Sequence, residues 1–154
     1  MSETDDYIAI TRLQNAYGDA VTRRAWDEFE KMFDRDAMIR VDTVTNDVIE
    51  CTGGKEIGDF IARSIERFEF FEFVPLNTVV DLYPDHDTSK ARGRLYICEL
   101  RQDASNGQFS QAFGVYHDDF HRASDGWRFA RRNYQSLART GRNEVFAFPQ
   151  SPWP

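Results

Sequence analysis

Glu99 is the carboxylate of this sequence best placed for proton-transfer chemistry. It follows Leu95 and Ile97 at steps of two in an apolar stretch. In a β-strand this spacing puts the three side chains on one face of the sheet. Apolar surroundings disfavour the charged carboxylate and raise its pKa toward values that suit an acid or base catalyst. A structural role, as an ion pair with Arg94 or Arg131, stays open as the alternative.

The histidines offer a second kind of chemistry, metal binding, at His117 and His121. They flank Asp118 and Asp119 and are four residues apart. On a strand they would share a face at about 13 Å from each other, whereas zinc ligands lie roughly 2.0 to 2.1 Å from one ion. The sequence therefore predicts no metal site. It also contains no glycine-rich phosphate loop, no GxSxG elbow and no CxxC pair.

Composition and charge limit the classes of protein that remain. The chain has 154 residues, 41% of them apolar, and a formal net charge of −7, which favours one globular domain over residues 1–154. The acidic balance argues against nucleic acid and anionic membranes as partners. No apolar run approaches the roughly 20 residues of a membrane span, and the acidic N-terminal residues are unlike a signal peptide. With two cysteines, Cys51 and Cys98, a cytoplasmic protein with reduced thiols is expected.

Hydrophobic periodicity predicts helices first and long strands afterwards. Apolar residues recur at three- and four-residue steps in the first part of the chain, and the period changes to two in the second part. The expected helices are residues 5–24, 26–33 and 55–68; the expected strands are 37–41, 47–52, 70–82, 91–101, 109–122 and 127–137. Compact polar turns join the four long strands and favour antiparallel neighbours. The pattern predicts an α+β fold, in which helices cover the concave side of one curved antiparallel sheet of about six strands.

Residues 141–154 form a tail outside this core, which spans residues 5–138. The tail carries Phe146, Phe148 and Trp153, but also three prolines that exclude a regular strand pair. So apolar a segment is expected to pack over a pocket mouth or onto a neighbouring subunit.

Several short motifs, in this order, resemble the SnoaL-like branch of the nuclear transport factor two superfamily, which includes scytalone dehydratase, bile-acid dehydratases and polyketide cyclases. The resemblance implies a cone-shaped fold, a deep apolar pocket that binds a hydrophobic small molecule, and a homodimer or homotrimer. The motifs are Tyr17-x-x-Ala20, Trp26-Asp27, Phe33-x-x-Asp36-Ala37, Gly53-Gly54, Gly114-x-Tyr116-x-Asp118 and Arg122 to Phe129 with its Asp125-Gly126-Trp127 turn.

The resemblance also assigns roles to individual positions. Tyr17 matches an oxyanion-binding tyrosine, Glu99 matches a second catalytic histidine, and Tyr116 matches a polar pocket residue. The aspartate and histidine of the usual acid/base pair fall on Thr22 and Val74, which cannot replace them. The catalytic candidates are therefore Tyr17, Glu99 and Tyr116, and the candidate substrate-binding residues are Thr22, Val74, Asn77, Ile97 and Trp127.

Two functions of different classes follow. The first is a cofactor-independent lyase or isomerase, of dehydratase, isomerase or cyclase type, that acts on a hydrophobic oxygenated polyketide-, steroid- or aromatic-like compound. The second is a non-catalytic ligand-binding or structural subunit, similar to the small subunit of ring-hydroxylating dioxygenases. The missing aspartate and histidine keep the second function open.

Overall fold

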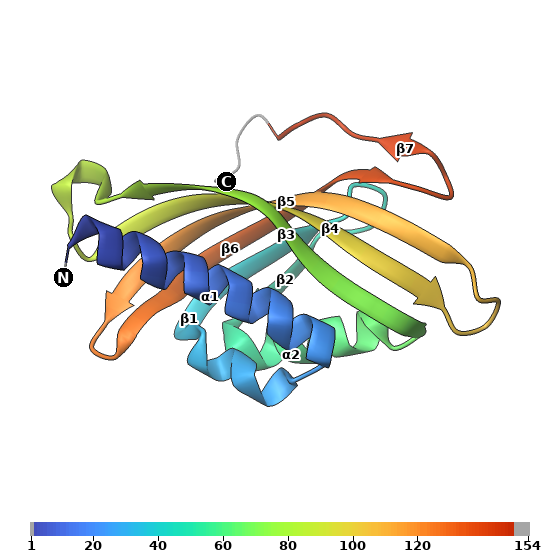
Figure 1. Cartoon of the computed structure of the whole chain (residues 1–154), viewed down its shortest axis with the longest axis horizontal. Coiled ribbons are helices and arrows are strands. Elements are labelled where there is room, and N and C mark those ends of the chain that lie inside the picture. The colour runs from blue at the N-terminus through green and yellow to red at the C-terminus, as the bar shows by residue number, and fades with distance from the viewer. Residues whose placement is uncertain (1, 150–154) are drawn as a thin grey trace.

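Helices of the N-terminal half lie under the concave side of one arched sheet (Figure 1). The structure, a computed structural model, describes residues 2–149. Its helices are α1 (Glu3–Arg23), η1 (Trp26–Lys31), α2 (Gly53–Ile65) and η2 (Pro84–His86). Its strands are β1 (Phe33–Asp42), β2 (Ile49–Thr52), β3 (Phe68–Leu82), β4 (Lys90–Asp103), β5 (Phe109–Ala123), β6 (Gly126–Arg139) and β7 (Glu144–Val145). The α+β fold with a strongly curved sheet is thus confirmed.

The strand order corrects one part of the expected sheet. The order is β2-β1-β6-β5-β4-β3, and β1 pairs with β6 in parallel, with Ile39 opposite Arg132. The other pairs are antiparallel, so the sheet is mixed. Alternation of apolar residues shows which side chains share a face, but it does not reveal the direction of the neighbouring strand.

Two helix ends also differ from the periodicity. The second helix is a 3-10 helix that ends at Lys31, and Phe33 already belongs to β1. The third helix ends at Ile65, and Phe68 begins β3. Both phenylalanines are buried in the common core. Their apolar side chains continued the three- and four-residue spacing of the helices, although both residues belong to strands. Of residues 2–149, no helix is long and apolar enough to cross a membrane.

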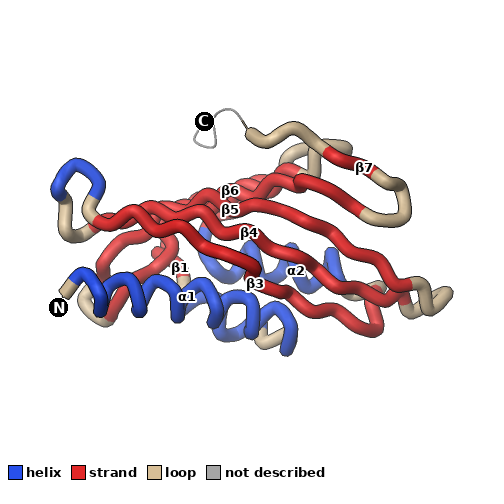
Figure 2. The backbone as a smooth tube through the Cα atoms, turned by 45° about the horizontal axis from the view of Figure 1, so that its top comes forward, coloured by secondary structure: helices blue, strands red, loops and turns tan. Residues whose placement is uncertain are grey.

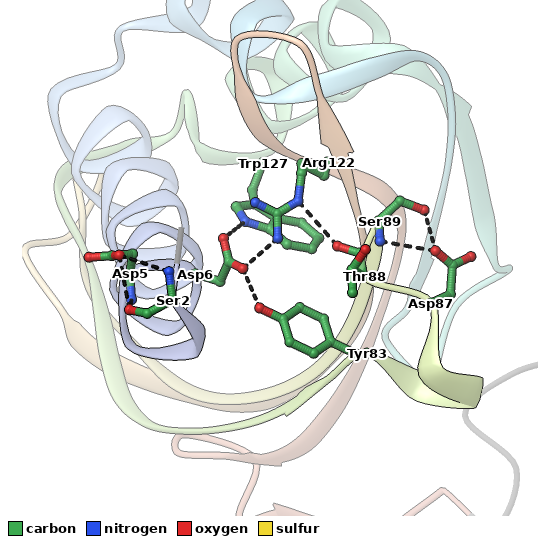
Figure 3. A network of polar contacts seen from close by, with 9 residues as sticks. All are labelled: Ser2, Asp5, Asp6, Tyr83, Asp87, Thr88, Ser89, Arg122 and Trp127. Carbon is green, nitrogen blue, oxygen red and sulfur yellow. Dashed lines mark hydrogen bonds and ion pairs between the residues drawn. The ribbon is translucent and has the colours of Figure 1, made fainter.

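Asp6 ties the first turns of α1 to the end of β5, the start of β6 and the residue that follows β3 (Figure 3). This carboxylate is fully buried and accepts hydrogen bonds from Tyr83, Arg122 and the indole N–H of Trp127, the last at 2.9 Å. These donors hold the pKa of Asp6 at about 2, although burial alone would raise it. Trp127 therefore serves this anchor at the N-terminus of α1.

The C-terminal tail crosses the convex face of the sheet, opposite the helices (Figure 2). The two-residue strand β7 of the tail pairs with β6. The prolines of the tail had predicted that it would form no strand pair. Beyond β7, Phe148 packs against Tyr96 and His117, and Gln135 donates a hydrogen bond to the Ala147 carbonyl at 2.9 Å. From β7 onward the described part of the tail thus covers outward-facing residues, whereas Arg142 at the start of the tail lines the cavity under the sheet. Trp153 lies outside the described residues.

Candidate functional site

A cavity of about 470 Å³ lies between the helices and the inner face of the sheet. One side of it is apolar. Helix α2 supplies Ile57, Phe60, Ile61 and Ile65, while Val21, Ile39, Val41, Phe68 and Phe71 come from α1, β1 and β3. A wall of this kind suits a hydrophobic ligand with a flat or polycyclic body.

The opposite side of the cavity is polar and comes from three adjacent strands. Glu99 and Arg101 lie on β4, Tyr116 lies on β5, and Tyr134 and Ser136 lie on β6. Tyr17 joins them from α1. The structure therefore brings the three candidate catalytic residues, Tyr17, Glu99 and Tyr116, to one cavity.

Tyr17 and Tyr116 lie side by side on the polar side of the cavity. Both are buried, their ring centroids are 6.0 Å apart, and the planes meet at 71°. Burial raises the pKa of Tyr17, although Arg132 and a hydrogen bond with Tyr116 partly oppose the shift. Burial also raises the pKa of Tyr116 well above its ordinary value. Both phenols are therefore neutral near pH 7, and the phenol whose O–H is not used in the hydrogen bond between them can donate to a ligand oxygen.

A fully buried arginine lies directly against these two phenols. The guanidinium carbon of Arg132 is 4.0 Å from the ring centroid of Tyr17, 3.8 Å from that of Tyr116 and 4.3 Å from that of Phe129. Its Nε atom lies 3.1 Å from an oxygen of Asp118, which is also fully buried. Burial raises the pKa of Asp118 to about 7, and Arg132 opposes that shift. This positive charge favours negative charge on an oxygen held by the two phenols.

Glu99 combines partial burial with a loose partner. Its side chain is 22% exposed, and one carboxylate oxygen lies 3.9 Å from Nη1 of Arg101, beyond hydrogen-bonding distance. Burial raises the pKa of Glu99, while Arg101 and Arg139 oppose the shift. No bidentate arginine occupies this carboxylate among residues 2–149. The partners considered from the sequence face elsewhere, since Arg94 contacts His117 and Arg131 approaches Asp119.

The five candidate substrate-binding residues do not line the cavity. The Thr22 hydroxyl bonds to the Gly18 carbonyl and to the Phe73 N–H, which joins α1 to β3. Val74 follows the inward Phe73 and therefore points to the other face, and Asn77 is exposed beyond a β-bulge. Ile97 is buried in the core next to the cavity. Trp127 binds Asp6 instead.

Sequence reasoning missed Arg101, Tyr134 and Arg132. The signal for Arg101 was present, because it continues the alternation that places Ile97 and Glu99 inward. Tyr134 and Arg132 were hidden by a bulge: Asp119 pairs with Arg131 and the next residue of β5 pairs with Phe129, so β6 changes its inward register there. Strict alternation from the inward-facing Phe129 would place the side chains of Arg132 and Tyr134 on the outward face.

No group of three or more His, Cys, Asp or Glu side chains is placed to hold a metal ion anywhere in residues 2–149. His117 lies on the convex face and accepts a hydrogen bond from Arg94 at 3.2 Å. His121 contacts Asp34 at 3.1 Å. His117 and His121 thus contact different residues and do not face a common site.

Gly114 leaves the space in which the Tyr134 ring packs. A Cβ at this position would lie 2.1 Å from Cε2 of Tyr134. We expect Gly114→Ala to push that ring aside, to lower the free energy of unfolding by about 1–3 kcal/mol, and to weaken ligand binding. Denaturant unfolding and ligand titration measure both effects.

Gly58 offers a matched control for this substitution. Its Cβ would meet ordinary contacts at 3.6 Å or more inside α2. Gly58→Ala should leave stability unchanged or raise it by up to about 1 kcal/mol, because alanine favours a helix. Equal effects of the two substitutions would contradict the role given to Gly114.

Helices under a curved sheet, with a cavity between them, define the nuclear transport factor two-like class of folds. The chain belongs to the SnoaL-like domain family, whose model matches residues 2–133. No curated protein matches the chain.

Solved structures share the fold at low sequence identity. One is a candidate scytalone dehydratase from Novosphingobium aromaticivorans, 18% identical, with a TM-score of 0.75 over 96% of this chain and 97% of that one. Another is the hexachlorocyclohexane dehydrochlorinase LinA-type3 from Novosphingobium barchaimii, 17% identical, with a TM-score of 0.76 over 95% and 97%. A candidate aromatic ring hydroxylase from N. aromaticivorans is 22% identical, with a TM-score of 0.73 over 89% and 92%.

Proposed function

We propose that the protein is an enzyme that moves a proton within a hydrophobic, oxygen-bearing small molecule of polyketide, steroid or aromatic type. The observation that carries this proposal is the placement of one weakly paired carboxylate, Glu99, and two neutral phenols, Tyr17 and Tyr116, around a single cavity. Relatives named as a dehydratase and a dehydrochlorinase support a lyase, and the family also supports an isomerase or cyclase.

The proposed chemistry begins at a carbon next to a ligand carbonyl. Glu99 takes a proton from that carbon, and the electron pair moves onto the carbonyl oxygen to form an enolate. The hydrogen-bonded pair of Tyr17 and Tyr116 donates its free O–H to this oxygen, and the nearby Arg132 stabilises its charge. Return of the proton at another carbon gives isomerisation, while loss of a leaving group from the enolate gives elimination.

A second function is favoured by the side chains at two positions. Thr22 and Val74 occupy the places of the usual aspartate and histidine, and neither lines the cavity. These facts support a ligand-binding or structural subunit that performs no chemistry of its own. The fold shared with a candidate aromatic ring hydroxylase adds to that support.

Turnover by the purified protein alone distinguishes the two functions. A panel of hydroxylated aryl ketones is incubated with wild type and with Ile61→Trp, which fills the cavity from α2. The enzyme proposal expects a product of changed mass or absorbance with wild type only. Binding to wild type without any product would support the non-catalytic subunit.

For the oligomeric state, we propose a homodimer or a homotrimer. Light scattering on the purified protein tests this by measuring its molar mass in solution.

A further inference from the structure

The charge of the cavity is opposite to that of the whole chain. Among its lining residues, Glu99 is the one acidic side chain, whereas four are arginines: Arg67, Arg101, Arg139 and Arg142. The chain as a whole carries 26 acidic and 19 basic residues. An acidic protein that concentrates arginine around one apolar cavity creates a local field that attracts anions.

Arg139 is largely committed to the protein itself. Its guanidinium donates hydrogen bonds to the hydroxyl of Thr45 and the carbonyl of Thr43, and it lies 3.4 Å from Glu144. These contacts hold the 43–45 segment, part of the cavity wall. This arginine therefore has less capacity left for a ligand.

Of the four arginines that line the cavity, Arg101 is the one with a buried donor that lacks a hydrogen-bond partner within residues 2–149. Its side chain is 16% exposed, its Nε atom is buried, and no partner for that atom lies among residues 2–149. Burial lowers the pKa of Arg101, and the like charges of Arg67 and Arg139 lower it further, whereas Glu99 opposes the shift. Both Arg101 and Arg67 stack on Phe68, at 5.2 and 4.7 Å from the ring centroid. An anion between these two cations would relieve their repulsion.

The strand register fixes where such an anion would lie relative to the reacting group. Tyr116 is opposite Leu95, and Arg101 lies six residues further along β4, about 20 Å away between Cα atoms. Glu99 lies between these levels, two residues or about 7 Å from Arg101. A ligand that reaches from the phenols to Arg101 is thus elongated, with its acidic group at the end remote from the carbonyl.

We infer that the substrate is an elongated hydrophobic or aromatic carboxylate, whose carboxylate is bound by Arg101 with help from Arg67, while its carbonyl lies at Tyr17 and Tyr116. This inference rests on the proposed function and names the class of substrate for that same cavity. Guanidinium groups suit a carboxylate because their N–H donors match its two oxygens. Arg101 thus acts as a specificity residue for an anionic ligand.

The test compares two ligands of the same shape that differ in charge. Calorimetric titration measures the Kd of 2-naphthoate and of the neutral 2-naphthamide with wild type. The naphthoate should bind at least about tenfold more tightly. In Arg101→Gln this preference should fall by about tenfold or more, whereas Arg101→Lys should keep most of it. Arg12→Gln, which removes the same charge from an exposed site on α1, should leave it unchanged.

Glu99→Gln should change naphthoate affinity in the direction opposite to Arg101→Gln. Removal of the one carboxylate beside Arg101 should leave naphthoate binding intact or strengthen it a few-fold, and should not alter naphthamide binding. Equal affinity of wild type for the two ligands, or an unchanged preference in Arg101→Gln, would overturn the inference but keep the small-molecule cavity. If neither ligand binds to wild type, the inference fails, and turnover of the aryl ketones decides the proposed function separately.

Discussion

Glu99→Gln is expected to lower turnover of a cavity substrate by about a hundredfold or more, because glutamine keeps the shape of the side chain but cannot accept the proton. Ligand affinity should be retained, since the phenols, the apolar wall and Arg101 all remain. Steady-state kinetics with a separate measurement of Kd distinguishes these effects. Circular dichroism should show that the variant is folded, because the one ion-pair contact of Glu99 within residues 2–149 is the 3.9 Å contact with Arg101.

Glu72→Gln is the matched control. Glu72 lies on β3, is exposed and does not line the cavity, so its substitution should leave both turnover and affinity unchanged. A structural ion pair at Glu99 would have the reverse signature: the free energy of unfolding would fall, and activity per folded molecule would survive. That result would remove the proton-transfer role.

Asp6→Ala is expected to have the larger effect on stability. It leaves Arg122, Tyr83 and Trp127 without their shared acceptor at a fully buried position. We expect the free energy of unfolding to fall by about 3–5 kcal/mol, as found when one partner of a buried charged pair is removed. Asp5→Ala, at the adjacent exposed residue that forms the capping box with Ser2, should cost only about 0.5–2 kcal/mol.

The difference in free energy of unfolding between wild type and Asp6→Ala should depend on pH in one direction. The pKa of Asp6 is lowered to about 2 in the folded protein, from an ordinary value of 3.8. Its stabilisation is therefore fully present above pH 4 and is lost as the pH falls toward 2. Denaturant unfolding should show the gap between wild type and Asp6→Ala narrowing over that range. A gap independent of pH would show that the charge of Asp6 does not contribute.

The sequence allowed the fold to be predicted because its signals are local and periodic. Apolar spacing in residues 5–24 indicated α1, and the alternation of Leu95, Ile97 and Glu99 indicated the inward face of β4. Direction of pairing is not a local property, which explains why the parallel pairing of β1 with β6 was missed. The same holds for the path of the tail across the convex face.

The site was less predictable because its geometry depends on register. The motif of Trp127 predicted a place in the cavity. Its indole N–H instead donates a hydrogen bond to Asp6, near the N-terminus of α1, whereas the cavity residue Tyr17 lies toward the other end of that helix. The bulge in β6 turned Tyr134 and Arg132 inward against the alternation of the strand. Tyr17, Glu99 and Tyr116 were found because each lies in a regular stretch of its element, where spacing alone fixes the face.

The most direct test of the central claim is the incorporation of deuterium next to a carbonyl. Proton removal at that carbon is the step that the proposed isomerisation, elimination and cyclisation share, so the measurement does not depend on knowing the final product. Aryl ketones shown to bind in the cavity are incubated in D₂O with wild type and with Glu99→Gln, and their mass is followed with time. Incorporation faster than in buffer with wild type, and lost in Glu99→Gln, is the predicted result. Tight binding without incorporation above the buffer rate would contradict it and identify a binding protein.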